Sequence, residues 1–165
     1  MLRCARGDDG SFCELVRRHG AALSAFFLRS GAGADAEDLS QKTLLKLHSA
    51  RGRYAPTAKF TTFMFTVANR VLLDHVRSSR RRADMLGRAG AEVPAAEEPP
   101  RTMGEAEDAE AALAALSPPL REAVVLVVMQ GLAYGEAAQA LGVPTGTVKR
   151  RVHDALLRMR RELER

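Results

Sequence analysis

The chain has few aromatic residues, with no tryptophan, two tyrosines and six phenylalanines among 165 residues. Strands draw on aromatic and β-branched residues, whereas this composition is rich in Ala and Leu and favours helices. No apolar run approaches the roughly 18 residues that a transmembrane helix needs. The N-terminal MLRCARGDDG also lacks the apolar core of a signal peptide. We therefore expect a cytoplasmic, all-α protein of one domain or two small ones.

Cysteine and histidine are also scarce, and their spacing excludes the usual metal-binding patterns. Cys4 and Cys13 do not form a CxxC pair, and the four histidines are scattered along the chain. A metal site needs several convergent ligands, so we expect no metal, no cofactor and no catalytic site built on either. A disulfide between the two thiols is not expected in a cytosolic chain.

Charge is unevenly distributed along the chain. Residues 1–82 carry a net charge of +8, residues 83–116 one of −6 and residues 117–165 one of +3, which together make the overall +5. Two basic blocks that flank an acidic middle suggest a polyanionic partner, although net charge alone is weak evidence for one.

Helical periodicity dominates the first basic block. Apolar residues recur at steps of three, four and seven over 11–29, and again from Phe60 onward, where the pattern is strongest. Gly31 and Gly33 predict a break, after which Asp35 is a good N-cap for a helix that ends near residue 49. Residues 51–59 contain Gly and Pro and predict a loop.

Proline, alanine and glutamate fill residues 83–106, which predicts a flexible, acidic linker. A short Ala-rich helix is expected at 107–116, and Ser117 followed by two prolines predicts the start of the next helix. The valine-rich run 124–128 has strand propensity, but its flanks and the lack of partner strands favour a buried helix.

The block 134–156 has the spacing of a helix-turn-helix, two short helices joined by a tight turn that contains Gly142. With Val148 and Val152 facing inward, the second helix exposes polar side chains that suit base edges and phosphates. The predicted DNA-contacting residues are Thr147, Lys149, Arg150, Arg151, His153 and Asp154. The alternative from spacing alone is an ordinary helical hairpin with a solvated Arg face.

Residues 116–163 resemble region four of sigma-70-family factors of the extracytoplasmic-function (ECF) group. The family pattern G-x-S/T-Y-x-E-I-A-x-x-L-G-V-P-x-G-T-V-K-S-R is followed closely, for example by LGVPTGTVK at 141–149. In the family this domain reads the −35 promoter element. Arg150 stands where Ser is usual and Asp154 where Arg is usual, so the resemblance implies an unusual base preference.

Residues 11–82 resemble region two of the same family through AEDLSQ at 36–41 and the segment that begins at Phe60. The resemblance implies that Asp38 and Gln41 contact core RNA polymerase, whereas the plain alternative for the acidic pair Glu37 and Asp38 is helix capping. It also implies capture of the −10 element, for which the candidates are Arg53, Tyr54, Lys59, Asn69, Arg70, Arg77, Arg80 and Arg81.

The resemblance implies a non-enzymatic sigma factor that binds core RNA polymerase and promoter DNA and no small-molecule substrate. The expected organisation is region two at 1–82, a flexible acidic linker at 83–110 and region four at 111–165. An anti-sigma factor, often membrane-anchored in the family, is an expected partner.

Two rival functions remain. A stand-alone helix-turn-helix regulator accounts for residues 117–163 but leaves the AEDLSQ helix unexplained. An enzyme acting on nucleic acid would need paired carboxylates with a metal, or an activated nucleophile, and the sequence offers neither spacing.

Overall fold

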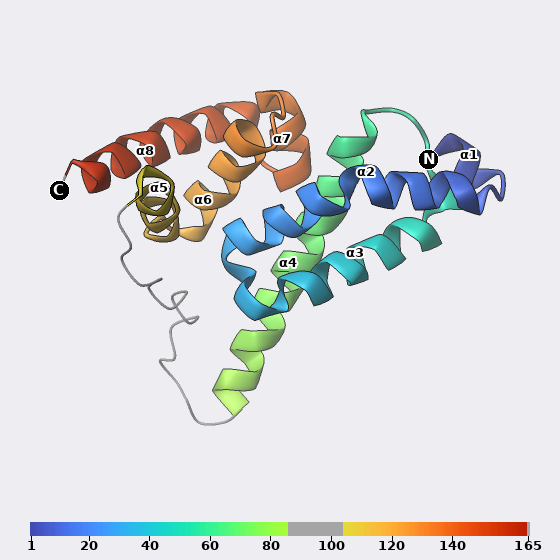
Figure 1. The fold of residues 1–165 in the computed structure, drawn as a ribbon, viewed down its shortest axis with the longest axis horizontal. Helices are drawn as coiled ribbons and strands as arrows, with labels where there is room; N and C mark the ends of the chain where they lie inside the picture. The colour runs from blue at the N-terminus through green and yellow to red at the C-terminus, as the bar shows by residue number, and fades with distance from the viewer. Residues whose placement is uncertain (86–103, 165) are drawn as a thin grey trace.

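Helices make up all the regular structure in residues 1–85 and 104–164, the parts of the chain that this computed structural model describes. They form two groups, each of which is a small helical domain (Figure 1). The first contains α1 (Leu2–Ala5), α2 (Asp9–Phe27), η1 (Leu28–Ala32), η2 (Gly33–Asp35), α3 (Ala36–Ser49), η3 (Arg51–Arg53) and α4 (Phe60–Met85). The second contains α5 (Glu105–Ala114), α6 (Pro118–Val124), η4 (Val125–Met129), α7 (Tyr134–Leu141) and α8 (Thr145–Leu163). The predicted all-α fold of two helical domains is confirmed.

Helix α2 begins at a side-chain cap and ends on a buried apolar face. The Asp8 carboxylate accepts a hydrogen bond from the backbone N–H of Ser11 at 3.0 Å, which satisfies a donor that the first turn leaves unpaired. Near its other end, Leu23, Phe26 and Phe27 are fully buried. Their spacing of three and four residues is the face that the periodicity predicts.

The predicted break between α2 and α3 is present. Gly31 has φ of +88°, a conformation that glycine adopts at little cost. Asp35 occupies the N-cap position of α3 as predicted, but its side chain makes no capping hydrogen bond among the described residues. Its backbone is already helical, unlike the extended backbone of a usual cap, and its Oδ2 lies 3.4 Å from His75 Nε2.

Helix α4 forms where the sequence pattern is strongest and runs three residues past the basic cluster, to Met85. It packs against α2 and α3, and its C-terminal end projects beyond the other helices (Figure 1). Its buried residues are Thr62, Met64, Phe65, Ala68, Asn69, Val71 and Leu72.

The valine-rich run is helical, as predicted, because α6 continues directly into the π-helical turn η4. Val125 and Leu126 are fully buried there, so tertiary packing overrides their strand propensity. Ser117 stands at the N-cap with Pro118 in the first turn, although the Ser117 side chain makes no capping hydrogen bond in the described structure. Gly131, with φ of +68°, follows the end of η4.

Helix α5 lies two residues earlier than the predicted 107–116. The Arg121 guanidinium donates to the carbonyl oxygens of Leu113, Ala114 and Leu116, which closes the C-terminal end of α5. Of the predicted linker at 83–110, residues 83–85 belong to α4 and 105–110 to α5, while residues 86–103 lie outside the described residues.

The two domains pack against each other. Helix α7 lies against α4, and α6 lies against η1 (Figure 1). Buried hydrophobic residues of both domains form one contiguous cluster. Among the described residues, no helix combines the length and apolar character needed to cross a bilayer.

Candidate nucleic-acid interface

The second domain contains a helix-turn-helix, formed by α7, a short turn and α8. Gly142 turns the chain in the left-handed conformation with φ of +67°, which satisfies the need for a residue without a Cβ at this C-cap. On α8, Val148, Val152 and Ala155 are buried, and Ala138 of α7 is buried as well. This packing leaves the opposite face of α8 to solvent.

The six predicted DNA contacts on α8 divide by exposure. Lys149, Arg150 and His153 are exposed, whereas Thr147, Arg151 and Asp154 are half-buried. The exposed three lie on successive turns of one helix face, which is the arrangement that a major groove accepts. The pattern therefore located the solvent-facing side of α8, and DNA contact by these residues stays a prediction.

Arg151 is half-buried on α8, and its charge acts on Glu122 of α6. Burial raises the pKa of Glu122 to about 7, while the charges of Arg151 and then Arg121 act to lower it. The half-buried guanidinium of Arg151 is less accessible to DNA than the exposed side chains of Lys149 and Arg150. The sequence-based reasoning missed Glu122, because nothing in the spacing of residues 122 and 151 indicates that α6 and α8 bring them together.

Lys149 is oriented by an aromatic neighbour. Its Nζ lies 5.9 Å from the centroid of the ring of Tyr134, the first residue of α7. A cation over an aromatic face is attracted by about 0.5–1 kcal/mol at an exposed site. The two helices of the motif thus both contribute to the surface around Lys149.

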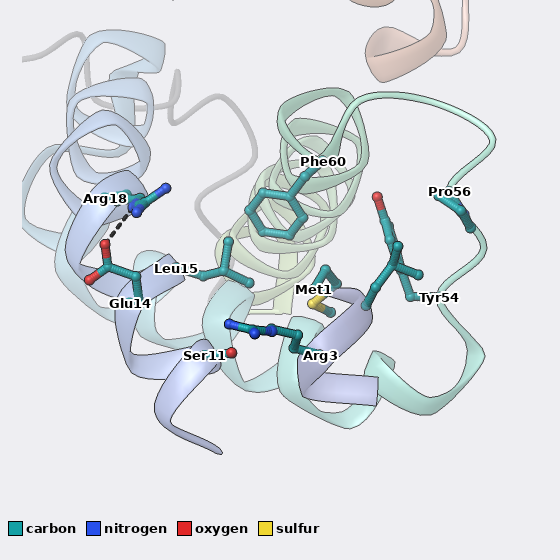
Figure 2. A pocket seen from close by; sticks show the side chains of 10 residues that line it. Met1, Arg3, Ser11, Glu14, Leu15, Arg18, Tyr54, Pro56 and Phe60 are labelled. Carbon is teal, nitrogen blue, oxygen red and sulfur yellow. Dashed lines mark hydrogen bonds and ion pairs between the residues drawn. The ribbon is translucent and has the colours of Figure 1, made fainter. Parts of the chain in front are cut away.

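In the first domain, a cavity of about 390 Å³ opens beside the loop that precedes α4 (Figure 2). Its walls come from α1, α2, the loop and the start of α4. The lining residues are Met1, Leu2, Arg3, Ser11, Glu14, Leu15, Arg18, Tyr54, Pro56 and Phe60. The cavity therefore combines an aromatic and aliphatic wall with two arginines and one carboxylate, that of Glu14. Its volume falls within the range of about 300–1,000 Å³ typical of ligand sites.

Aromatic rings support one wall of this cavity. Tyr54 packs against Phe63 with ring centroids 5.2 Å apart and against Phe60 at 6.4 Å. His19 meets Phe60 at 5.3 Å, and burial lowers the pKa of His19, which favours the neutral ring. Phe60 and Phe63 thus pack mainly against neighbours, as their spacing predicts, and they hold Tyr54 at the cavity edge.

On the other wall, an ion cluster on α2 fixes the charged groups. Glu14 accepts hydrogen bonds from Arg17 and Arg18, and these two arginines lower its pKa to about 2. Figure 2 shows Arg18 and Glu14 paired at the rim, across the cavity from Tyr54. Sequence reasoning missed Arg3, Ser11 and Arg18 as cavity residues, because only the tertiary fold brings α1 and α2 to the loop.

The predicted −10 residues occupy three different environments. Tyr54 is half-buried at the cavity, and Asn69 is almost fully buried, with 3% of its surface exposed. Asn69 Nδ2 donates to the carbonyl oxygen of Ala140 in α7 at 3.4 Å. The remaining predicted residues are exposed, and they are Arg53, Lys59, Arg70, Arg77, Arg80 and Arg81. The structure thus leaves the arginines at the surface and withdraws Asn69 from it.

Lys59 is exposed but paired across the domain boundary. Its Nζ lies 2.9 Å from Glu136 Oε1 of α7. Glu136 also accepts from the backbone N–H of Ala133 at 2.9 Å, and this bond first, then Lys59, lowers the Glu136 pKa. Glu136 therefore belongs both to the helix-turn-helix and to the domain interface, a second role that its sequence position does not reveal.

The predicted polymerase-contacting residues lie on the outer face of α3. Asp38 and Gln41 are exposed one turn apart. Asp38 Oδ2 pairs with Lys42 Nζ at 3.0 Å, and Gln41 Nε2 donates to Glu37 Oε1 at 3.5 Å. Both side chains are accessible to a partner protein. The negative charges of Glu37 and Asp38 also suit the first turn of α3, which is the positive end of its helix dipole.

Taken together, these helices define an all-helical protein of two domains, the second of which contains a helix-turn-helix. Residues 15–82 match the family described as sigma-70 region 2, and residues 106–159 match sigma-70, region 4. The ECF sigma factor SigF of Caulobacter vibrioides is 33% identical over 100% of this chain and 92% of its own length. SigE of Mycolicibacterium smegmatis is 35% identical over 90% of this chain, which spans only 61% of that relative.

Solved structures agree with these matches. The sigma factor RpoE of Bartonella quintana, in complex with the anti-sigma factor NepR, superposes with a TM-score of 0.81 at 26% identity, over 93% of this chain and 97% of that one. CnrH, in complex with the cytosolic domain of CnrY, superposes with a TM-score of 0.72 at 26% identity, over 98% of this chain and 93% of that one. The chain belongs to the sigma-70 family of RNA polymerase sigma factors, in its ECF group.

Proposed function

We propose that this sigma factor directs RNA polymerase to promoters by holding DNA at two sites, the exposed face of α8 and the cavity beside Tyr54. The observation that carries the proposal is the division of α8 into a buried face and an exposed face that bears Lys149, Arg150 and His153. The helix can enter a major groove without unfolding its own domain.

At the −35 element, Arg150 and Lys149 are the candidates for guanine edges or phosphates, and Asp154 is one for a cytosine amine. Arg151 contributes less, because its side chain is half-buried. The family pattern has Ser and Arg at the positions of Arg150 and Asp154. An unusual base preference at those two contacts follows from this proposal.

At the −10 element, the cavity takes a base that has left the DNA stack. Unstacking costs a few kcal/mol, and stacking on an aromatic ring such as Tyr54 returns about 1–3 kcal/mol per base. Arg3 lines the same cavity and suits a phosphate beside the base, whereas Arg18 is already bonded to Glu14. The exposed arginines of α4 extend this basic track along the backbone.

Core polymerase docks, in this proposal, on the outer face of α3 through Asp38 and Gln41. The polymerase supplies the chemistry of RNA synthesis, so the sigma factor needs no catalytic group of its own. We also propose an anti-sigma protein as a regulator, since RpoE was solved with an anti-sigma factor and CnrH with the cytosolic domain of CnrY. The domain limits proposed are 1–82 and 111–165, with the acidic segment 83–110 between them.

Transcript-start mapping tests the function. The purified chain is mixed with core polymerase and supercoiled genomic DNA, and the starts are sequenced. We expect specific starts that share two upstream elements, and a double variant Arg150→Ala/Asp154→Ala that loses or shifts the −35 sequence. The matched control, Arg160→Ala/Glu164→Ala, removes the same charges from exposed positions near the end of α8 and keeps the starts unchanged.

The rival function has a distinct outcome in the same experiment. A stand-alone regulator binds duplex DNA sequence-specifically by itself, forms no complex with core polymerase and yields no specific starts. That result would leave α8 as a DNA-reading helix and would remove the polymerase role.

A further inference from the structure

The chain has four lysines, and their ammonium groups have different partners. Three of them pair with carboxylates, and these are Lys42, Lys46 and Lys59. The fourth, Lys149 on α8, is exposed, and its Nζ lies 5.9 Å from the centroid of the Tyr134 ring. No ion pair joins Lys149 to another described residue. An aromatic ring attracts a cation without neutralising it, so the positive charge of Lys149 stays available to a phosphate.

The ring of Tyr134 is fixed at the edge of a buried helix face. Tyr134 is the first residue of α7, and Ala137 and Ala138, three and four residues later on the same face, are buried. The hydrogen bond from the Ala133 N–H to Glu136 Oε2 closes the turn that leads into Tyr134. Tyr134 itself is 39% exposed. Its ring is therefore covered on one side and open on the other, which suits a group that orients a neighbour at the surface.

Lys149 and Arg150 occupy different sides of α8. Val148 and Val152 are buried and mark the inner side of the helix. Each residue turns about 100° round an α-helix, because 3.6 residues complete one turn. Arg150 therefore lies nearly opposite the inner side, whereas Lys149 lies on a flank. The contact between Lys149 and Tyr134 shows that this flank faces α7.

These two sides of α8 meet different parts of a bound duplex. In a helix-turn-helix, the second helix lies in the major groove while the first crosses the DNA backbone. The side of α8 opposite its buried face is thus directed at base edges, and the flank beside α7 is directed at the backbone. An ammonium suits a phosphate as a point charge, whereas a guanidinium can donate twice to one guanine.

We propose that Tyr134 is a positioning residue for −35 recognition: its ring holds the Lys149 ammonium at the flank beside α7, where Lys149 contacts a phosphate and leaves base reading to Arg150. This inference rests on the proposed −35 role of α8. It goes beyond that role, because it divides the two exposed cations between the backbone and the bases and gives this division a cause in α7.

A double-mutant cycle on holoenzyme tests the inference. Affinity is measured for a library of duplex promoters that differ in the −35 element, with Tyr134→Leu, Lys149→Gln and both changes together. We expect Tyr134→Leu to weaken binding to every library member by about two- to fivefold, the range that an exposed cation–π contact supports. In the Lys149→Gln background, the same change should have no further effect, because the cation that the ring positions is gone.

The salt dependence and the base preference of Lys149→Gln show where this side chain binds. Loss of one phosphate contact should lower the slope of log affinity against log salt by about 1 and leave the preferred −35 sequence unchanged. A structural defect in α7 or α8 would not produce this pair of results, since it would disturb base contacts as well.

Three further variants complete the design. Tyr134→Phe retains the ring and should bind as the wild type does. Tyr134→Met removes the ring but keeps a long apolar side chain, and it repeats the cycle if leucine at this position disturbs folding. The matched control, Arg160→Gln, removes an exposed cation near the end of α8, and its effect should simply add to that of Tyr134→Leu.

Four results would overturn the inference. Tyr134→Leu leaves affinity unchanged, its loss adds fully to that of Lys149→Gln, Tyr134→Phe loses as much affinity as Tyr134→Leu, or Lys149→Gln changes the preferred base at one position. Each of these results leaves specific starts by the wild-type holoenzyme intact. Failure of the proposed function is instead seen as the absence of those starts with the wild-type chain.

Discussion

At the scale of single residues, the arginines proposed to contact DNA lie in two settings, the exposed face of α8 and the end of α4. Arg150 is exposed in the first half of α8, on a helix whose opposite face buries Val148 and Val152, whereas Arg80 is exposed near the end of α4. In the proposed function, Arg150 reads base edges in a major groove and Arg80 contacts phosphates. Removing each of the two arginines should therefore change DNA binding in a different way.

Arg150→Ala should weaken binding of holoenzyme to its preferred −35 duplex by about 1–3 kcal/mol and relax preference at one base pair. Arg80→Ala should weaken binding to all promoters alike and reduce the slope of log affinity against log salt by about 1. Holoenzyme affinities for a promoter library at several salt concentrations measure both effects. A uniform loss for Arg150→Ala would assign it to the backbone instead.

At the scale of elements, the start of α7 is capped from one side only. The Glu136 carboxylate accepts from the Ala133 backbone N–H, but Ala133, at the N-cap, has no side-chain oxygen to return a bond to the first turn. Its backbone is extended, with φ of −63° and ψ of 151°, as a capping serine requires. The family pattern has Ser or Thr at this position, so the helix-turn-helix here lacks half of a capping box.

Ala133→Ser should complete that box and raise the free energy of unfolding by about 1 kcal/mol, since the hydroxyl can accept from the N–H of residue 136. Urea denaturation of the full chain measures the change. Ala133→Gly serves as the comparison, because it supplies no side-chain acceptor and should gain less than the serine variant. Equal stability of the serine variant and the wild type would contradict a cap at this site.

A second element-scale feature is the carboxyl group of Glu122 between α6 and α8. Burial raises its pKa to about 7 from an ordinary 4.5, against the opposing charges of Arg151 and Arg121. The folded state thus binds this proton more tightly than the unfolded chain does. The contribution of Glu122 to stability is therefore full below pH 4.5, falls as pH rises to about 7 and is constant above that.

Glu122→Gln should remove that dependence, because the amide is neutral at every pH. We expect the variant to gain stability relative to the wild type between about pH 5 and about pH 8, by at most about 3 kcal/mol at roughly 1.36 kcal/mol per pKa unit. Denaturation curves at the two pH values measure the difference. If the difference in the free energy of unfolding between the wild type and the variant is the same at both pH values, Glu122 is already ionised at the lower pH.

At the scale of the whole molecule, the two domains share buried surface. Buried hydrophobic residues from α2 to α8 belong to one contiguous cluster, and α4 carries contacts to both its own domain and α7. Domains that share a core unfold together, whereas domains that only touch unfold separately. The interface therefore decides how many transitions the chain shows.

We expect calorimetry of the wild-type chain to show a single unfolding transition at low salt. Ala140→Glu, which disrupts the packing of α7 on α4, should split it into two transitions. A control variant, Glu164→Gln, changes an exposed residue near the end of α8 and should keep the single unfolding transition. Two transitions in the wild type would mean that the buried cluster does not couple the domains.

Much of the fold could be predicted from the sequence. Periodicity from Phe60 predicts α4 because a helix that buries one face must repeat its apolar residues at three and four. The glycine at 142 and the valines at 148 and 152 predict the helix-turn-helix and the exposed face of α8 for the same local reason. The bounds of α5 differ from the predicted ones, and its C-terminal end is closed by the guanidinium of Arg121, eight residues beyond Leu113.

Only the tertiary structure decided which predicted DNA residues are free. Asn69, Lys59 and Arg151 were all predicted to contact DNA. In the structure, however, Asn69 is buried and donates to Ala140 of α7, Lys59 pairs with Glu136, and Arg151 is half-buried. Local pattern determines which face of a helix is apolar, because adjacent turns set it. Which partner meets a polar side chain depends on elements distant in the chain, such as α4 and α7, and no spacing along the sequence encodes that meeting.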